Sequence, residues 1–138
     1  MSEVIQIYIL LLLLGGMVFF PAVVAPAIFS SLDIKMSGMV LRRLFPNYYL
    51  FIIVLALIAG FLGKLTSVAT AACIVIVVTT VLVRQILLPK INQWRDEELS
   101  GNLDSAKKFN LSHRLTVILN LLQMALIVYT IGSDLISI

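Results

Sequence analysis

Four long apolar runs dominate the sequence and constrain its fold more than any other feature. They cover about residues 4–29, 45–62, 65–88 and 111–131. A helix needs about 20 apolar residues to cross the hydrocarbon core of a bilayer, because each residue adds about 1.5 Å. In lipid the backbone polar groups must be paired within the protein, and the runs do not alternate as barrel strands would. The sequence therefore predicts four transmembrane helices.

Composition excludes a water-soluble domain. The 138 residues are 61% hydrophobic and 12% charged, whereas a soluble domain has about 45–50% apolar and about 25% charged residues. The length allows one domain only. We therefore expect residues 1–138 to form a single all-α, four-span membrane domain whose main partner is the lipid bilayer. The first run follows no basic segment and is too long for a signal peptide, so we expect it to be retained.

The connections predict a four-helix bundle of up-down-up-down topology. We expect a polar loop over residues 31–44, a tight turn at residues 63–64 and a longer polar segment over residues 90–110. Inside the last segment, KINQWRDEEL precedes a Ser-Gly-Asn breaker at residues 100–102. This pattern predicts a short interfacial helix between the third and fourth spans, with Trp94 anchored at the membrane surface.

The basic residues predict how the chain is oriented. Nine of the ten Lys and Arg residues flank the first and third connections, namely Lys35, Arg42, Arg43, Arg84, Lys90, Arg95, Lys107, Lys108 and Arg114. Only Lys64 lies on the other side. Basic loops stay in the cytoplasm, so we expect both termini to lie outside it, in a bacterial inner membrane. Because the charges sit between apolar runs and not on a soluble module, nucleic acid is not an expected partner.

Polar residues in two spans line up at helical spacing. In the fourth span, steps of three and four residues join His113, Thr116, Asn120, Gln123, Thr130 and Asp134, with Ile127 in the one gap. The third span repeats the spacing with Thr66, Thr70, Cys73, Thr80 and Arg84. Small and hydroxyl residues allow close helix approach and hydrogen bonds between helices. We expect the two stripes to face each other, either as packing contacts or as the wall of a polar pocket.

The charged members of these stripes define a candidate site at the cytoplasmic mouth of the bundle. An ionisable group inside a span is a functional-site hypothesis by default, and Arg84 and His113 lie at similar depth on facing stripes. We expect Arg84 to point into the mouth beside His113. Its expected hydrogen-bond partner is a bound anion or one of five side chains: Asp33, Asp96, Asn47, Tyr48 and Asn92. The alternative is that it extends to the lipid phosphates. The candidate ligand-binding residues are Arg84, His113, Asn47, Tyr48, Asn92, Asn120 and Gln123.

Four segments carry a resemblance to a known family. They are PAVVAPAIFSSL at 21–32, LFPNYY at 44–49, LLPKINQWRD at 87–96 and FNLSHRLTVILNLLQ at 109–123. With the four-span layout, they resemble the domain of unknown function 4149, a family that includes transmembrane-protein-205-like proteins. The resemblance implies a four-helix membrane bundle and no agreed activity. Members are linked to metal or drug tolerance, and similar bundles occur among copper-resistance and porphyrin-oxidising membrane proteins.

Three functions fit these observations. The first is a non-enzymatic membrane protein that binds an anionic or amphipathic ligand at the mouth, as an accessory or transport component; arginine suits phosphate and carboxylate groups. The second is a haem- or quinone-dependent oxidoreductase that uses His113 as ligand or proton donor. The chain has one histidine, so a bis-histidine haem site would need a dimer. The third is a structural subunit of a homo-oligomer or of a membrane partner. We expect no metal site, because no Cys/His cluster has zinc spacing, and no resident cofactor.

The charge bias gives a direct test of orientation. A reporter enzyme that is active only in the cytoplasm should give no signal when fused after Ile138, because the C-terminus then lies outside. The same reporter fused to a chain that ends at residue 102, within the basic third connection, should be active and serves as the control. Activity of the full-length fusion would contradict the predicted orientation.

Overall fold

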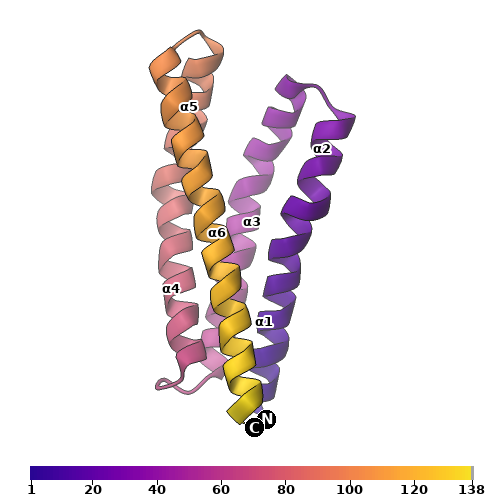
Figure 1. The fold of residues 1–138 in the computed structure, drawn as a ribbon, viewed down its shortest axis with the longest axis vertical. Coiled ribbons are helices and arrows are strands. Elements are labelled where there is room, and N and C mark those ends of the chain that lie inside the picture. The colour runs from indigo at the N-terminus through magenta and orange to yellow at the C-terminus, as the bar shows by residue number, and fades with distance from the viewer. Residues whose placement is uncertain (138) are drawn as a thin grey trace.

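The computed structural model describes the backbone of residues 1–137 and all side chains except those of residues 134, 135, 137 and 138. Its described elements are all helical and form four antiparallel rods (Figure 1). These are α1 (Ser2–Phe19), the π-helical turn η1 (Phe20–Val24) and α2 (Ala25–Ser31); α3 (Ile34–Leu62); α4 (Val68–Leu82), the π-helical turn η2 (Val83–Leu87) and α5 (Leu88–Leu99); and α6 (Leu103–Ser137). All four rods are long and apolar enough to cross a membrane. The predicted all-α, four-span bundle is confirmed.

Side-chain caps begin three of the rods. Asp33 accepts a hydrogen bond from the backbone N–H of Met36 at 2.8 Å and caps α3. Ser67 caps α4 and Asn102 caps α6 in the same way. The loop predicted over residues 31–44 is therefore wrong: once Asp33 has started the helix, residues 34–44 contain no stronger breaker than one glycine, which a long helix tolerates. The Ser-Gly-Asn turn is confirmed, with Gly101 at a φ of 101° that favours glycine.

Both π-helical turns end two residues before a proline. The backbone N–H of Ala25 bonds the carbonyl of Phe20, and that of Leu88 bonds the carbonyl of Val83, five residues back in each case. Pro26 and Pro89 follow directly. Proline has no N–H, and its ring crowds the carbonyl four residues earlier, so a wider turn relieves the clash without ending the helix.

The third rod consequently continues past Pro89 as α5, and does not stop where the apolar run ends. The short helix predicted between the third and fourth spans corresponds to α5 (Leu88–Leu99), but it extends the third rod and is not a separate element. Its location at the membrane interface stays a prediction.

The tightest packing lies in the half of the bundle that carries the chain termini. The fully buried side chains there include Leu10, Leu13, Met17, Ile52, Ile76 and Ile127, which come from all four rods. Ala56, Ala59 and Ala69 are also buried and bring α3 and α4 close together. This half therefore contains most of the buried apolar core of the bundle.

The two polar stripes meet as predicted. Thr70, Cys73 and Thr80 on α4 and Gln123 and Thr130 on α6 are all buried. The Gln123 amide donates hydrogen bonds to the hydroxyls of Thr79 at 2.8 Å and Thr80 at 3.1 Å. Asp134, the last member of the predicted stripe, lies outside the described side chains. The packing prediction for Thr70, Cys73 and Thr80 is confirmed.

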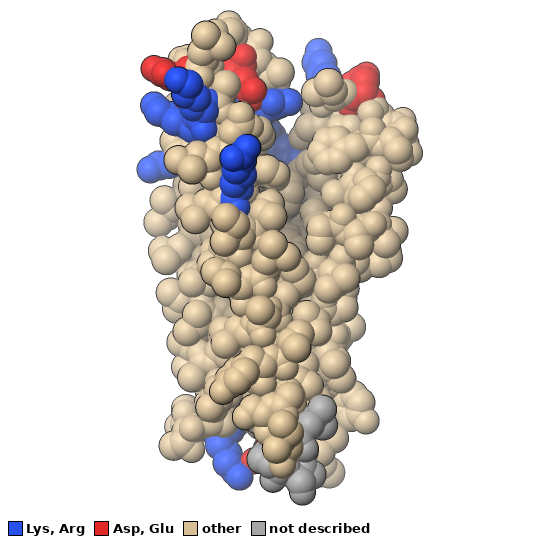
Figure 2. Space-filling model, in the orientation of Figure 1, with Lys and Arg blue, Asp and Glu red and all other residues tan. Residues whose placement is uncertain are grey.

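Charge is concentrated at the end of the bundle opposite the termini, which we call the basic end (Figure 2). At the terminal end, Lys64 pairs with Glu3 at 2.8 Å, and this hydrogen bond and charge raise the pKa of Lys64. At the basic end, Arg42 of α3 pairs with Asp96 of α5 at 2.6 Å and also donates to the backbone carbonyl of Asn92 at 3.3 Å. These contacts tie two rods together across the basic end.

The rods splay apart towards the basic end (Figure 1). All four prolines of the chain, Pro21, Pro26, Pro46 and Pro89, lie in this half. They fall in the first, second and third rods, and α6 has none. Prolines kink helices, so three of the four rods can diverge here while the terminal half stays packed.

Two adjacent glycines test the packing of α1 on α3. A β-carbon at Gly16 would overlap the ring of Phe51, whereas one at Gly15 would meet nothing within 4 Å. Gly16→Leu should lower the free energy of unfolding by about 1–3 kcal/mol, because the ring must leave the helix contact. Gly15→Leu is the matched control and should leave stability unchanged or slightly raised. Denaturant unfolding in detergent micelles measures both, and equal losses would contradict this packing.

Candidate functional site

A groove of about 270 Å³ lies between three rods in the basic half of the bundle. It is open and not enclosed, and the surface is visibly hollowed between the two lobes at this end (Figure 2). Its walls are mostly apolar and aromatic: Phe20, Pro21, Ala25 and Phe29 from the first rod, Leu41, Phe45, Tyr48 and Tyr49 from α3, and His113, Thr116, Val117, Asn120, Leu121 and Met124 from α6. Apolar walls with few polar groups are typical of ligand sites.

Aromatic rings form one side of the groove. Phe20 of η1 stacks on Tyr48 of α3, with ring centroids 4.5 Å apart, and Phe45 stacks on Tyr49 at 6.0 Å. The LFPNYY segment places three of these rings within five residues of α3. Ring pairs of this kind add stability beyond simple burial, so they form a preformed wall.

The polar atoms of the groove come from α3 and α6. The Tyr48 hydroxyl donates a hydrogen bond to the Asn120 side-chain oxygen at 3.1 Å. The Thr116 hydroxyl donates to the backbone carbonyl of His113 at 2.8 Å. This small polar band crosses an otherwise apolar surface and can orient a polar group of a bound molecule.

A second, much smaller cavity of about 10 Å³ adjoins the polar band. Five of its lining side chains carry a polar group: Tyr49, Thr80, Thr116, Asn120 and Gln123. A volume of about 10–15 Å³ with several polar partners is enough for one water molecule. Asn120 and Thr116 line both cavities, so the stripe between α4 and α6 leads directly into the groove.

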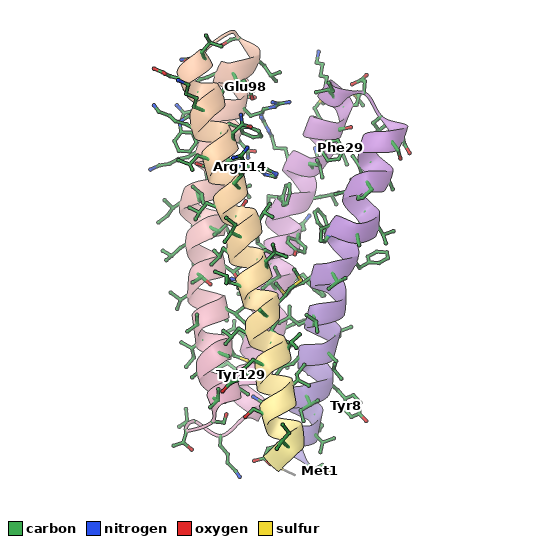
Figure 3. The ribbon with its side chains drawn as sticks, viewed as in Figure 1. Met1, Tyr8, Phe29, Glu98, Arg114 and Tyr129 are labelled. Atoms are coloured by element: carbon green, nitrogen blue, oxygen red, sulfur yellow. The ribbon has the colours of Figure 1, made fainter. Side chains whose placement is uncertain are left out.

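His113 lines the groove close to the basic end. Its ring lies parallel to that of Phe109, with an interplanar angle of 6° and centroids 5.9 Å apart. On α5, the Arg95 guanidinium lies 5.1 Å from the Phe109 ring centroid, a cation–π contact. Figure 3 shows Arg114, the next residue on α6, at about the level of Phe29 on α2. The basic end of α6 thus borders the groove.

Arg84 bonds the backbone and none of the five side chains expected as its partners. Its Nε donates a hydrogen bond to the backbone carbonyl of Pro46 at 3.0 Å. In the described part of the chain no hydrogen bond joins Arg84 to His113, and Asp96 is paired with Arg42. The carbonyl that Pro46 leaves without its helical donor is that of Arg42, four residues earlier. The Pro46 carbonyl itself lies within the continuous helix α3, so Arg84 is an additional donor to it and joins the third rod to α3.

The seven candidate residues therefore separate into two groups. Tyr48, His113 and Asn120 line the groove, and Gln123 lines the small cavity beside it. The groove lining does not include Arg84, Asn47 or Asn92 among the described residues. The Asn47 amide donates to the carbonyl of Arg43 in its own helix at 3.3 Å, and Asn92 meets Arg42 through its backbone. The sequence prediction missed the wall residues Phe20 and Met124, although the two prolines of the first run marked its irregular end.

The polar groups of the groove are few and neutral. Its lining holds one imidazole, one amide and three hydroxyl groups, with no carboxylate. Among the residues that the structure describes, no group of three or more His, Cys, Asp and Glu side chains is placed to hold a metal ion. The groove can surround the apolar part of a molecule, and its few polar side chains can form hydrogen bonds with that molecule.

The fold and the groove define a multi-pass membrane protein built as a four-helix bundle. The chain belongs to the family described as a domain of unknown function (DUF4149), whose sequence model matches residues 8–100. The matched range includes two walls of the groove and excludes the α6 wall, so the 109–123 segment and the likeness to transmembrane protein 205 stay predictions. Among curated proteins and solved structures, no significant match was found.

The bond between Tyr48 and Asn120 can be tested by removing one hydroxyl. Tyr48→Phe keeps the stacked ring and should lower the free energy of unfolding by about 0.5–1.5 kcal/mol, since hydrogen bonds between membrane helices are modest. Tyr8→Phe is the matched control, because the Tyr8 side chain is exposed, and it should leave stability unchanged. Thermal unfolding in micelles measures both variants; an unaffected Tyr48→Phe protein would mean that the bond contributes nothing.

Proposed function

We propose that this chain is a small non-enzymatic membrane protein that holds an anionic or amphipathic ligand in the groove, as an accessory, transport or tolerance component. One observation carries the proposal: an apolar groove with a few polar groups lies open in the half of the bundle that carries almost all of the positive charge. An apolar ligand body would gain from burial, and the polar groups would fix its orientation.

Charge favours an anion at this end of the bundle. Nine Lys and Arg residues stand there against five acidic ones, Asp33, Asp96, Glu97, Glu98 and Asp104, which leaves a net charge of +4 (9 − 5). An excess of positive charge at a membrane surface attracts anionic groups. The proposal includes the orientation expected from the same charges, with the groove opening towards the cytoplasm of a bacterial inner membrane and both termini outside.

A second candidate function rests on the position of His113. Because this histidine lines the groove, a haem or quinone ring held there would make the protein an oxidoreductase. A visible-absorption spectrum of the purified protein separates the two functions. A Soret band that disappears in His113→Ala would favour the oxidoreductase and count against a purely non-enzymatic role.

Binding can be tested with a soluble amphipathic anion. Purified protein in a neutral maltoside detergent is titrated with decyl phosphate, and native mass spectrometry counts the bound copies. Decyl trimethylammonium, which has the same chain and the opposite charge, should bind more weakly. Ala25→Leu should weaken decyl phosphate binding by about tenfold, because it fills the groove at a cost of about 1–3 kcal/mol.

The control variant is Ala27→Leu, on the same short helix as Ala25. Ala27 is exposed and lies outside the groove lining described here, so the substitution should leave binding unchanged. Equal binding by both variants, or no preference for the anion over the cation, would overturn the proposed function.

A further inference from the structure

The open side of the groove points to the physical source of its ligand. We infer that the groove receives one acyl chain of an anionic phospholipid, which enters sideways from the membrane leaflet at the basic end. This inference rests on the proposed function and names the ligand class of the same site.

The groove lies within segments that are apolar enough to cross a membrane. The lining residues, at 20–29, 41–49 and 113–124, all belong to candidate membrane spans. The first rod borders the groove differently along its length. Its α1 part packs against both α3 and α6, whereas its α2 part packs against α3 and diverges from α6 (Figure 1). The gap between α2 and α6 is therefore bordered by lipid. A lipid chain can enter without crossing water, whereas a soluble ligand must first partition into the bilayer.

The groove is long, narrow and parallel to the helices. Along α6, His113 and Met124 mark its two ends, and eleven residues span about 16 Å at the helical rise. Along the first rod, Phe29 and Phe20 are separated by about 13 Å on the same basis. The volume of about 270 Å³ lies at the lower limit of ligand sites, which start at about 300 Å³. These dimensions suit one extended chain and not two.

The polarity of the groove matches that of a lipid in its leaflet. Its outer end lies at the basic end, where a phosphate would meet cationic side chains and the His113 ring, and its inner end lies at Met124, near the middle of the bundle. A chain that slides in keeps its head at the surface and does not have to flip. Deeper in the groove, the Asn120 oxygen already accepts from Tyr48, so a chain lying over this pair would break no hydrogen bond.

The test uses tryptophan fluorescence and brominated lipids, which quench only on contact. Trp94, the single natural tryptophan, is replaced by phenylalanine. One tryptophan is then placed in the groove with Leu121→Trp, and as a control on the lipid-facing surface with Leu122→Trp, since Leu122 is 62% exposed and outside the groove lining. Vesicles hold mixtures of phosphatidylglycerol and phosphatidylcholine in which either one carries bromine on its chains.

We expect the groove tryptophan to prefer phosphatidylglycerol over phosphatidylcholine by about fivefold, the factor that one favourable basic contact supplies at a surface. The control tryptophan should show a ratio near one. Adding Ala25→Leu should remove the preference at position 121 without changing position 122. The same ratio at both positions would mean bulk annular lipid only and would overturn the inference. Should Leu121→Trp fail to fold, Val117→Trp provides the groove reporter.

The outcomes distinguish this inference from the proposed function. Binding of decyl phosphate together with equal quenching at both tryptophans would keep an amphipath site in the groove and reject a lipid as its occupant. Failure of decyl phosphate to bind, with equal quenching, would reject both. Selective quenching that Ala25→Leu abolishes would support the lipid, whatever the soluble probe does.

Discussion

The structure depends on one constraint: in hydrocarbon, every backbone N–H and C=O must find its partner inside the protein. Four prolines lie in the basic half, and each one removes a donor from a helix that has to stay continuous. Two π-helical turns, in the first and third rods, are the local responses. Because prolines bend three of the four rods, the same half of the bundle opens into a groove.

The two halves of the bundle differ in their packing: the terminal half is tightly packed, and the basic half contains the groove. In the terminal half, small residues and buried apolar side chains hold the rods together, and near the middle of the bundle the Gln123 amide bonds α6 to α4. In the basic half, α5 packs against α6, and α3 is joined to the other rods by the exposed Arg42–Asp96 pair, the Tyr48–Asn120 bond and the Arg84 bond to the Pro46 carbonyl. Exposed ion pairs contribute little to stability, so the Arg42–Asp96 pair alone does not hold α3 in place. Such a division is expected where a binding region needs to move.

The sequence predicts the parts of this arrangement that follow from periodicity. Hydropathy gives the four spans, and the spacing of Thr80 and Gln123 gives their facing stripes. The sequence does not predict contacts that depend on how the helices are placed in three dimensions. Arg84 bonds a backbone carbonyl, an acceptor that every residue carries and no pattern singles out. The Arg42–Asp96 pair joins residues 54 positions apart, and helix continuation at Pro89 depends on a π-turn that has no sequence signature of its own. Polarity marked residues 31–44 as a loop, because a helix end that leaves the membrane is as polar as a loop.

The π-helical turn η1 also changes the rotational phase of the first rod. A turn bonded five residues back contains one residue more than an α-helical turn, and one residue corresponds to about 100° of rotation. Leu10 and Leu13 before η1 face the core, while Ala25 and Phe29 after it face the groove. The extra residue thus rotates the side chains that follow it about the helix axis. One continuous helix can therefore face the core before η1 and the groove after it. A homologue lacking that single residue would keep its span and its core contacts, yet present another face of α2 to the groove.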